Sequence, residues 1–331
     1  MTYNGLPNFG NTCYINATLQ CIFNLPNFKI TKPKSTLGQA LMNLRAQYKR
    51  GTLSNIDVHF FFQICRNELQ MDFSQQNDMQ EFYLALMNKM IEKEGRDTAE
   101  KLESAIANEK ACRGNIDQHF YAKCKVAWWK DFKNTWSPFV NVLTGQVVSQ
   151  TKCPMCGYIV HNPELFINVD VDTKCKAESN PSNPSDLHDL LKQFYGIENV
   201  EGWKCDKCQV MCGAGRILKI THLPKVLVIT LKRFDAHGNK KHDRVIIPHT
   251  LTIPEDAHVF DRAQRYKLYA MGCHQGNQYG GHYYAVVMTG NDDECTIIND
   301  NVITKNAAAK VAGHEPYMLF YTTINGLESC E

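Results

Sequence analysis

The sequence predicts an α+β protein in which a helical lobe is followed by a larger β-rich region. From Gly38 to about Glu109, apolar residues recur three and four positions apart, which is the spacing of one face of an α-helix. After Phe120 the chain changes to short runs rich in β-branched and aromatic residues, which favour strands. Its 331 residues, 44% of them hydrophobic, suffice to bury a sizeable core.

The helical pattern is clearest in two segments of this lobe. In DMQEFYLALMNKMIEK, apolar residues from Met79 to Met90 fall on one stripe, and IDVHFFFQICRNEL has the same periodicity. Farther on, the Ser, Asn and Pro residues of KAESNPSNPSD indicate a surface loop that leads into a helix capped by Ser185 or Asp186. The runs that predict strands are FVNVLTGQVVSQ, LFINVDVD, RILKITH, KVLVITLKRF, RVIIP, YKLYAMG, HYYAVVMT, CTIIND and PYMLFYTTI.

The charge balance argues against several classes of partner. The 36 Lys and Arg residues nearly cancel the 34 Asp and Glu residues, so no overall basic field favours nucleic acid or an anionic membrane surface. The longest apolar runs fall far short of the roughly 18 residues of a membrane-spanning helix. We therefore expect neither a nucleic-acid nor a membrane partner.

Cysteine usage indicates a reducing compartment. The segment MTYNGLPNFGNTCY carries no positive charge before its first apolar stretch, so we expect no cleaved signal peptide. Without such a signal, 14 cysteines are better explained as metal ligands, nucleophiles and buried thiols than as a disulfide framework. We expect a cytoplasmic or nuclear location, or both.

Four of these cysteines form two CxxC pairs, which are Cys153 with Cys156 and Cys205 with Cys208. Each pair can bind one Zn²⁺ through two thiolates, and two pairs complete a closed tetrahedral site without an open position. Such a zinc ion would be structural. The alternative is that some of these residues are buried free thiols. Cys212 is close enough in sequence to replace a ligand, and Cys175 is a further alternative.

Cys13 is a candidate nucleophile because the segment Gly10–Tyr14, which contains it, stands just before the amphipathic run INATLQCIF. At a helix N-terminus, the positive end of the helix dipole and unpaired backbone N–H groups lower a thiol pKa and can hold an oxyanion. A small packed side chain is the alternative explanation for an isolated cysteine. A partner base would favour the nucleophile.

His282 is the candidate base, since it lies between two glycines and the strand AVVMT, where the backbone leaves room for a substrate. The imidazole then needs a group that binds its other nitrogen. Asn299 and Asp300 follow the strand CTII and would return beside His282 in an antiparallel meander. An ordinary Asn-Asp turn is the alternative, and local spacing does not choose between the two.

Taken together, these segments resemble the ubiquitin-specific proteases, a family of thiol deubiquitinases, from Gly5 to Tyr321. GLPNFGNTCYINATLQ is similar to the cysteine box of the family, and YKLYAMGCHQGNQYGGHYYAVV is similar to its histidine box. QNDMQEF resembles the glutamine-rich box, the CxxC pairs resemble the fingertip zinc ribbon, and LPKVLVITLKRF and PYMLFY resemble palm strands.

This resemblance implies a variant of the papain-like cysteine protease fold with a helical thumb, a β palm and zinc-ribbon fingers. We expect a single catalytic domain over residues 1–331. The thumb would occupy residues 1–120, the fingers most of 121–220, and the palm most of 221–331.

The resemblance also implies the catalytic roles. Cys13 would be the nucleophile, His282 the general base and Asn299 the residue that orients the imidazole, with Asp300 as an alternative or helper. Asn8 would donate to the oxyanion hole beside the Cys13 backbone N–H, where one donor contributes about 3 to 4 kcal/mol. One structural Zn²⁺ is expected and no catalytic cofactor.

The implied substrate is ubiquitin, whose body would rest on the fingers and whose tail would run between thumb and palm. The tail carries arginines and ends in two glycines, so carboxylates would bind it through charge-assisted hydrogen bonds. The same carboxylates favour a helix N-terminus, and both explanations can hold. For the aromatic residues of the channel, ordinary palm packing is the alternative. The expected substrate contacts are Gln76, Asp78, Glu81, Phe234, His274 and Tyr283.

The chain departs from the family pattern in two places. Cys295 and Ile298 stand where the family usually has Trp and Phe before the third triad residue, so the packing of that strand would differ. His161 and Asn162 follow the first CxxC pair in place of a smaller polar pattern.

The expected function is hydrolysis, through an acyl-enzyme, of the isopeptide or peptide bond after the last glycine of ubiquitin. The partners would be ubiquitin and ubiquitinated proteins, and the protein would be a monomer. A catalytically silent ubiquitin-binding module with the same fold is the rival, although a complete set of Cys13, His282 and Asn299 favours the enzyme. The same chemistry on another ubiquitin-like modifier is a second alternative.

Overall fold

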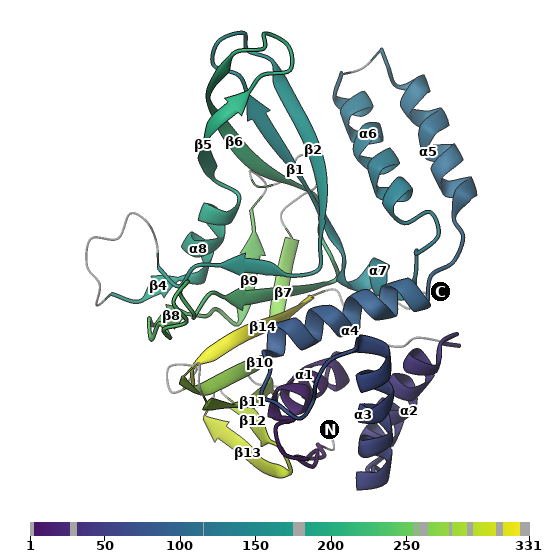
Figure 1. Cartoon of the computed structure of the whole chain (residues 1–331), viewed down its shortest axis with the longest axis vertical. Helices are drawn as coiled ribbons and strands as arrows, with labels where there is room; N and C mark the ends of the chain where they lie inside the picture. Colours follow the sequence, from purple (N-terminus) through teal and green to yellow (C-terminus); the bar gives the residue numbers. More distant parts are fainter. Residues whose placement is uncertain are drawn as a thin grey trace.

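The computed structural model describes residues 3–26, 32–114, 116–174, 183–254, 257, 264–277, 280–289, 294–308 and 314–324. Helices make up the N-terminal part of the chain and sheets make up most of the remainder (Figure 1). This arrangement confirms the α+β class. We call the helical part the thumb, the four-stranded sheet the fingers and the larger sheet the palm.

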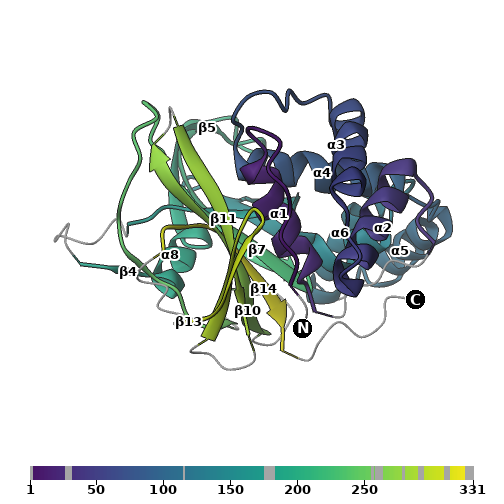
Figure 2. The ribbon, with the colours of Figure 1, turned by 90° about the horizontal axis from the view of Figure 1, so that it is seen from below.

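Helix α1 (Cys13–Phe23) is the centre of the thumb, because every one of its residues is buried. It packs against α4 on one side and palm strand β11 on the other, and seen from below it lies between the palm strands and the other thumb helices (Figure 2). A helix enclosed in this way is largely apolar, and its buried polar residues Asn16, Thr18 and Gln20 form hydrogen bonds. The other helices of this part are α2 (Thr36–Arg50), α3 (Asn55–Leu69), α4 (Met79–Lys93), α5 (Ala99–Ala111), α6 (Ile116–Asp131) and α7 (Pro138–Leu143).

The helical part extends beyond residue 120, where we expected it to end. Helix α6 continues to Asp131, and α7 occupies the segment that was expected to begin a strand. Ser137 caps α7 through the Val140 backbone N–H, and Pro138 stands in its first turn. Both residues favour a helix start, whereas the short apolar run that follows them is compatible with either structure.

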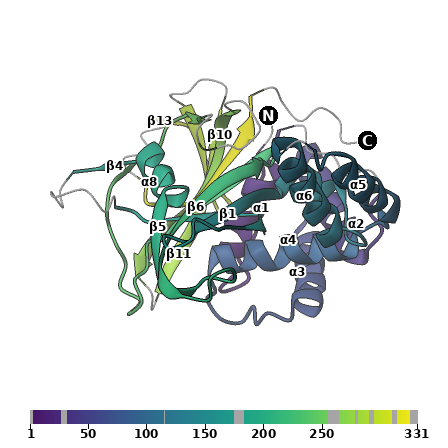
Figure 3. The same cartoon turned by 90° about the horizontal axis from the view of Figure 1, so that it is seen from above.

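The fingers sheet has the strand order β2-β1-β6-β5, and all its neighbouring strands are antiparallel. The hairpin of α5 and α6 stands beside it (Figure 1), on the helical side of the molecule when seen from above (Figure 3). Strand β5 is mostly exposed and polar, which explains why the sequence did not predict it. The strands are β1 (Gly145–Lys152), β2 (Ile159–Phe166), β5 (Ile197–Lys204) and β6 (Met211–His222).

The palm sheet has the strand order β13-β12-β11-β10-β14-β7-β3, and β9 pairs with β10 at its side. Pairing is antiparallel except between β3 and β7. Strand β7 is buried along its whole length, as expected for a run that is apolar except at Thr230. The strands are β3 (Val169–Val171), β7 (Val226–Leu231), β9 (Thr250–Ile253), β10 (Gln264–Asn277), β11 (Gly280–Met288), β12 (Glu294–Asn299), β13 (Val302–Ala308) and β14 (Pro316–Thr323).

A small parallel pair, β4 (Ser185–Asp186) and β8 (Val245–Ile246), flanks helix α8 (Leu187–Phe194). Of the two candidate caps, Asp186 makes the bond, because its side chain accepts from the His188 backbone N–H. In the part of the chain that the structure describes, no helix is long and apolar enough to cross a membrane.

The palm sheet separates two apolar cores. One face packs on the thumb, where Tyr14, Phe82 and Phe320 are almost fully buried. The other face packs on α8 and β9, around Leu190 and Leu251. This arrangement fixes the edge of the palm against the N-terminus of α1, which is where the site lies.

Candidate active site

Cys13 is the first residue of α1 and is 4% exposed. Its position at the helix N-terminus agrees with the prediction, and it places the thiol near backbone N–H groups that α1 itself does not use. The residue before it, Thr12, makes no side-chain cap of α1. Instead, the Thr12 hydroxyl and backbone N–H both donate to Asn8 Oδ1 at 3.2 Å.

His282 lies near the start of β11 and reaches Asn299 at the end of β12. Strands β11 and β12 are neighbours in the palm, and the Nε2 atom of His282 is 2.5 Å from Asn299 Oδ1. Hydrogen bonding to the Cys13 thiol, which outweighs burial, raises the pKa of His282 to about 9, and Asn299 adds to this effect. The structure therefore brings Cys13, His282 and Asn299 into one row.

Asp300 is a second neighbour of the imidazole, and it carries a carboxylate where Asn299 carries an amide. Its Oδ2 atom lies 3.8 Å from His282 Nε2, farther than the Asn299 oxygen. Asn16 Nδ2 donates to Asp300 Oδ1 at 2.7 Å, and Asn8 Nδ2 donates to Oδ2 at 2.9 Å. The backbone φ of +50° at Asp300 belongs to the left-handed region that Asp tolerates better than most residues.

Asn8 is bound on both sides of its amide group. The oxygen accepts from Thr12, and the nitrogen donates one of its two N–H groups to Asp300. This pairing ties the loop before Cys13 to the turn after Asn299. The second N–H is the group required for the oxyanion role of Asn8, which remains a prediction.

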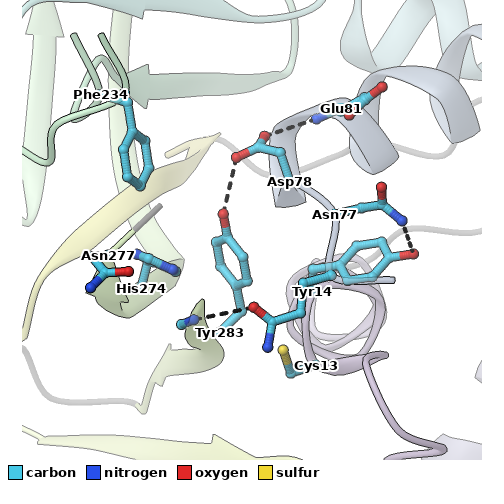
Figure 4. A pocket seen from close by; sticks show the side chains of 12 residues that line it. Cys13, Tyr14, Asn77, Asp78, Glu81, Phe234, His274, Asn277 and Tyr283 are labelled. Carbon is cyan, nitrogen blue, oxygen red and sulfur yellow. Dashed lines mark hydrogen bonds between the residues drawn. The ribbon is translucent and has the colours of Figure 1, made fainter. Parts of the chain in front are cut away.

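Cys13 lies at the edge of a cleft of about 330 Å³ between thumb and palm (Figure 4). All six residues expected to contact the substrate line this cleft, including Phe234 and His274 from distant parts of the palm. Sequence reasoning missed several others, although all but Gly238 lie within or beside the quoted boxes. The thumb contributes Tyr14, Gln76, Asn77, Asp78 and Glu81, and the palm contributes Phe234, Gly238, His274, Asn277, Gly281 and Tyr283.

Two hydrogen bonds join the walls of this cleft. The Tyr283 hydroxyl donates to Asp78 Oδ2 at 3.0 Å, and the Gly281 backbone N–H donates to Gln76 Oε1 at 3.2 Å. Burial and the neighbouring Asp78 raise the pKa of Tyr283 far above its usual range. Asp78 Oδ1 meanwhile accepts from the backbone N–H groups of Gln80 and Glu81, so it caps α4 and also faces the cleft.

His274 forms part of the palm wall in a neutral state. Burial, helped by the nearby Lys240, lowers the pKa of His274 to about 4. Its ring lies 4.5 Å from that of Tyr283 and 5.7 Å from that of Phe234. A Cβ added at Gly281 would come within 2.1 Å of His274 Nε2, so only glycine allows this approach.

Strand β12, which holds the two departures from the family pattern, packs regularly against β11. Cys295 and Ile298 are both buried, and they pair with Met288 and Ala285 of β11. Smaller side chains than Trp and Phe therefore still hold β12 in register beside β11, and Asn299 reaches the imidazole.

The two CxxC pairs meet at the tip of the fingers. Their four sulfur atoms lie within 4.8 Å of one another, with Cys153 to Cys208 at 3.8 Å and Cys156 to Cys205 at 3.6 Å. A tetrahedral site with Zn–S bonds of about 2.3 Å requires sulfur separations of about 3.8 Å. The Cys156 and Met155 backbone N–H groups lower the pKa of Cys153 to about 6. These residues fit a metal ion.

The alternative ligands are not part of this group. Cys212 follows the second pair in β6 but is not among the four clustered sulfurs, and Cys175 lies outside the described residues. His161 and Asn162 lie farther down β2, where they pair with Gln150 and Ser149 of β1. They therefore belong to the sheet and not to the metal site.

Comparison with protein families matches residues 4–321 to a family described as ubiquitin carboxyl-terminal hydrolase. The chain belongs to this family. Membership confirms the resemblance drawn from the cysteine and histidine boxes, which are the segments that supply Cys13 and His282.

Curated relatives in this hydrolase family cover nearly the whole chain. Ubiquitin carboxyl-terminal hydrolase 5 of Saccharomyces cerevisiae is 27% identical over 97% of the chain and 44% of its own length. Ubiquitin carboxyl-terminal hydrolase 21 of Mus musculus is 26% identical over 96% of the chain and 61% of its own length. The chain thus spans less than half of the first relative and about three fifths of the second.

Solved structures show the same fold. The SAGA DUB module of Ubp8, Sgf11, Sus1 and Sgf73 bound to monoubiquitin matches with a TM-score of 0.71 at 20% identity, over 97% of this chain and 69% of that chain. The same module bound to ubiquitin aldehyde matches with a TM-score of 0.69 at 21% identity, with equal coverage. These similarities confirm the arrangement of thumb, palm and ribbon-tipped fingers.

Proposed function

We propose that the protein is a cysteine hydrolase that cleaves the isopeptide or peptide bond after the C-terminal glycine of ubiquitin. The observation that carries this proposal is the row of Cys13, His282 and Asn299 at the edge of a cleft between thumb and palm. Family membership supports ubiquitin as the substrate.

The reaction would proceed through an acyl-enzyme. The Cys13 thiolate attacks the carbonyl carbon of the last glycine, and the resulting oxyanion is bound by the Cys13 backbone N–H and by Asn8. The His282 imidazolium then gives its proton to the leaving amine as the C–N bond breaks. A water molecule attacks the thioester while His282 accepts its proton, which releases the ubiquitin carboxylate and the Cys13 thiolate.

The cleft walls suit the tail of ubiquitin. Asp78 and Glu81 offer carboxylates to its arginines, where charge-assisted bonds are stronger than neutral ones. The rings of His274 and Tyr283, in contact with each other, and Gly281 line the same cleft, where a narrow passage would favour glycine. Ubiquitin's two terminal glycines match this passage.

The metal at the fingertip is proposed to be one structural Zn²⁺. Four thiolates from two CxxC turns are the donor set that zinc prefers, and they leave no position for a substrate. The ion would hold the two turns together while Cys13 and His282 carry the chemistry. We also propose a monomer in the cytoplasm or the nucleus, on the basis of the sequence alone.

The decisive test is the reaction of the purified, zinc-loaded protein with ubiquitin that carries a thiol-reactive group at its C-terminus. A single adduct mapped by mass spectrometry to Cys13, absent in Cys13→Ala, is expected. A folded protein that binds ubiquitin without forming an adduct would instead be the silent binding module. Reaction only with a probe built on another Gly-Gly modifier would replace ubiquitin as the substrate.

A further inference from the structure

Helix α3 exposes large apolar side chains beside the site. Ile56 is 80% exposed and Phe60 is 60% exposed, and they lie four residues apart on one helix face. Phe9, 42% exposed, adjoins this face, because its ring lies 5.4 Å from that of His59 and 5.8 Å from that of Phe62. We call Phe9, Ile56, His59 and Phe60 the thumb patch.

The exposed residues of the patch are not needed for packing α3 onto the thumb core. The opposite side of α3 already buries Val58, Phe61, Phe62 and Cys65. A capping box formed by Ser54 and Asp57 starts the helix independently of the exposed residues. Exposed aliphatic and aromatic side chains that adjoin one another are typical of a surface that binds another protein.

The patch adjoins the loop that leads into Cys13 and lies outside the cleft. Phe9 belongs to the loop between Asn8 and Thr12, and its backbone N–H donates to the Thr12 hydroxyl at 3.0 Å. None of the four patch residues lines the cleft, whose thumb wall comes from Tyr14 and the start of α4. The tail of ubiquitin would fill the cleft up to Cys13. The group bonded to its last glycine would therefore lie beyond the cleft, near Cys13 and the loop with Phe9 that leads into it.

We infer that the thumb patch binds the protein that donates the scissile amine, and that this protein is a second ubiquitin within a polyubiquitin chain. This inference rests on the proposed function. In such a chain the leaving group is a folded domain whose lysine nitrogen is bonded to the glycine carbonyl carbon that Cys13 attacks, so the surface of this domain would lie close to the loop before Cys13. The patch has no carboxylate or ammonium group, and it therefore fits an apolar face of that domain.

The test compares two leaving groups at the same catalytic centre. One substrate is ubiquitin with a small fluorogenic amine at its C-terminus. This small leaving group cannot contact the thumb patch. The others are diubiquitins of each linkage. The double variant Ile56→Ser with Phe60→Ser removes the apolar side chains and leaves the cleft intact. Ile246→Ser is the matched control, because its side chain is 51% exposed at β8, across the molecule from α3 (Figure 1).

For at least one linkage, the double variant should lower kcat/KM on diubiquitin fivefold or more, while hydrolysis of the fluorogenic substrate changes less than twofold. Phe60→Leu should retain the diubiquitin rate, and Ile246→Ser should change neither rate. The inference is overturned if the double variant, with an unaltered melting temperature, affects both substrates equally or affects neither. It is also overturned if the wild type cleaves the fluorogenic substrate but no diubiquitin, whereas failure on all substrates would reject the proposed function itself.

Discussion

The ammonium group of Lys240 lies 2.7 Å from the backbone carbonyl oxygen of His274. The Lys240 side chain is only 2% exposed, and its second acceptor is Glu315 Oε2 at 2.5 Å. The other carboxylate oxygen of Glu315 lies 2.7 Å from His242 Nδ1. A buried positive charge thus supports the strand that brings His274 into the cleft.

Replacing Lys240 by Met should affect both stability and His274. The carbonyl oxygen and Glu315 would lose a buried donor, which costs about 1 to 3 kcal/mol in free energy of unfolding. The pKa of His274 should rise, because the Lys240 charge helps to lower it, yet remain below 6.5 because burial persists. Urea unfolding and an NMR titration of His274 measure the two effects. Lys241→Met is the control, since Lys241 is 37% exposed and pairs with Asp172 at 3.9 Å; an equal response in both variants would contradict the role of Lys240.

Replacing Cys13 by Ala should lower the pKa of His282 from about 9 toward 6.5, because the thiol is the main group that raises it. In the wild type, the stabilisation from this pairing is present below pH 6.5 and is lost as the pH rises through about 9. The decline in unfolding free energy between these pH values should therefore be shallower in the variant. An NMR titration of His282 that gives the same pKa in both proteins would refute the contact between these side chains.

Asn299 should matter more than Asp300 for catalysis. Its oxygen is the nearer partner of His282 Nε2, at 2.5 Å against 3.8 Å, and Asp300 is shared with Asn8 and Asn16. We expect Asn299→Ala to reduce kcat on a fluorogenic ubiquitin substrate by about 10 to 100-fold or more, as lost orientation of a catalytic group does. Asp300→Asn should reduce it less. The reverse order would assign the orienting role to Asp300.

Removing the ribbon ligands should affect stability and not chemistry. The double variant Cys153→Ser with Cys205→Ser is expected to lose one zinc ion per chain by elemental analysis and to melt at a lower temperature. Its folded fraction should still be labelled at Cys13 by the ubiquitin probe, although more slowly if the fingers bind ubiquitin less well. Cys112→Ser, a change at the C-terminal cap of α5 and outside the four clustered cysteines, should keep the metal. Unchanged metal content in the double variant would exclude these cysteines as ligands.

The sequence predicted which candidate residues lie together better than it predicted the element boundaries. Cys13, His282 and Asn299 could be named because each stands in a short motif with its own chemical logic, and β11 and β12 do bring the last two together. The segment at α7 was wrongly expected to be part of a strand. A run of six mostly apolar residues is too short to show whether apolar residues repeat with the spacing of a helix or of a strand. The cap made by Ser137 and the proline in the first turn favour the helix.

Contacts between distant segments could not be predicted in this way. Nothing local to Lys240 indicates that its side chain is buried against His274, since that depends on how the turn after Phe234 folds back on β10. The bond from Asn8 to Asp300 likewise joins the two ends of the chain. Such pairs follow from the packing of thumb on palm, which a linear pattern does not contain.

The tight approach of Gly281 to His274 bears on how active and inactive copies of this enzyme are told apart in genomes. Under the proposed function, a relative that retains Cys13, His282 and Asn299 would still have its tail passage altered by one added methyl group at Gly281, because that group would displace the His274 ring. Such a protein would still bind the body of ubiquitin, but the C-terminal tail could not enter the cleft. Surveys of pseudoenzymes that inspect only the triad would count it as active, so the residue before the histidine belongs among the positions they examine.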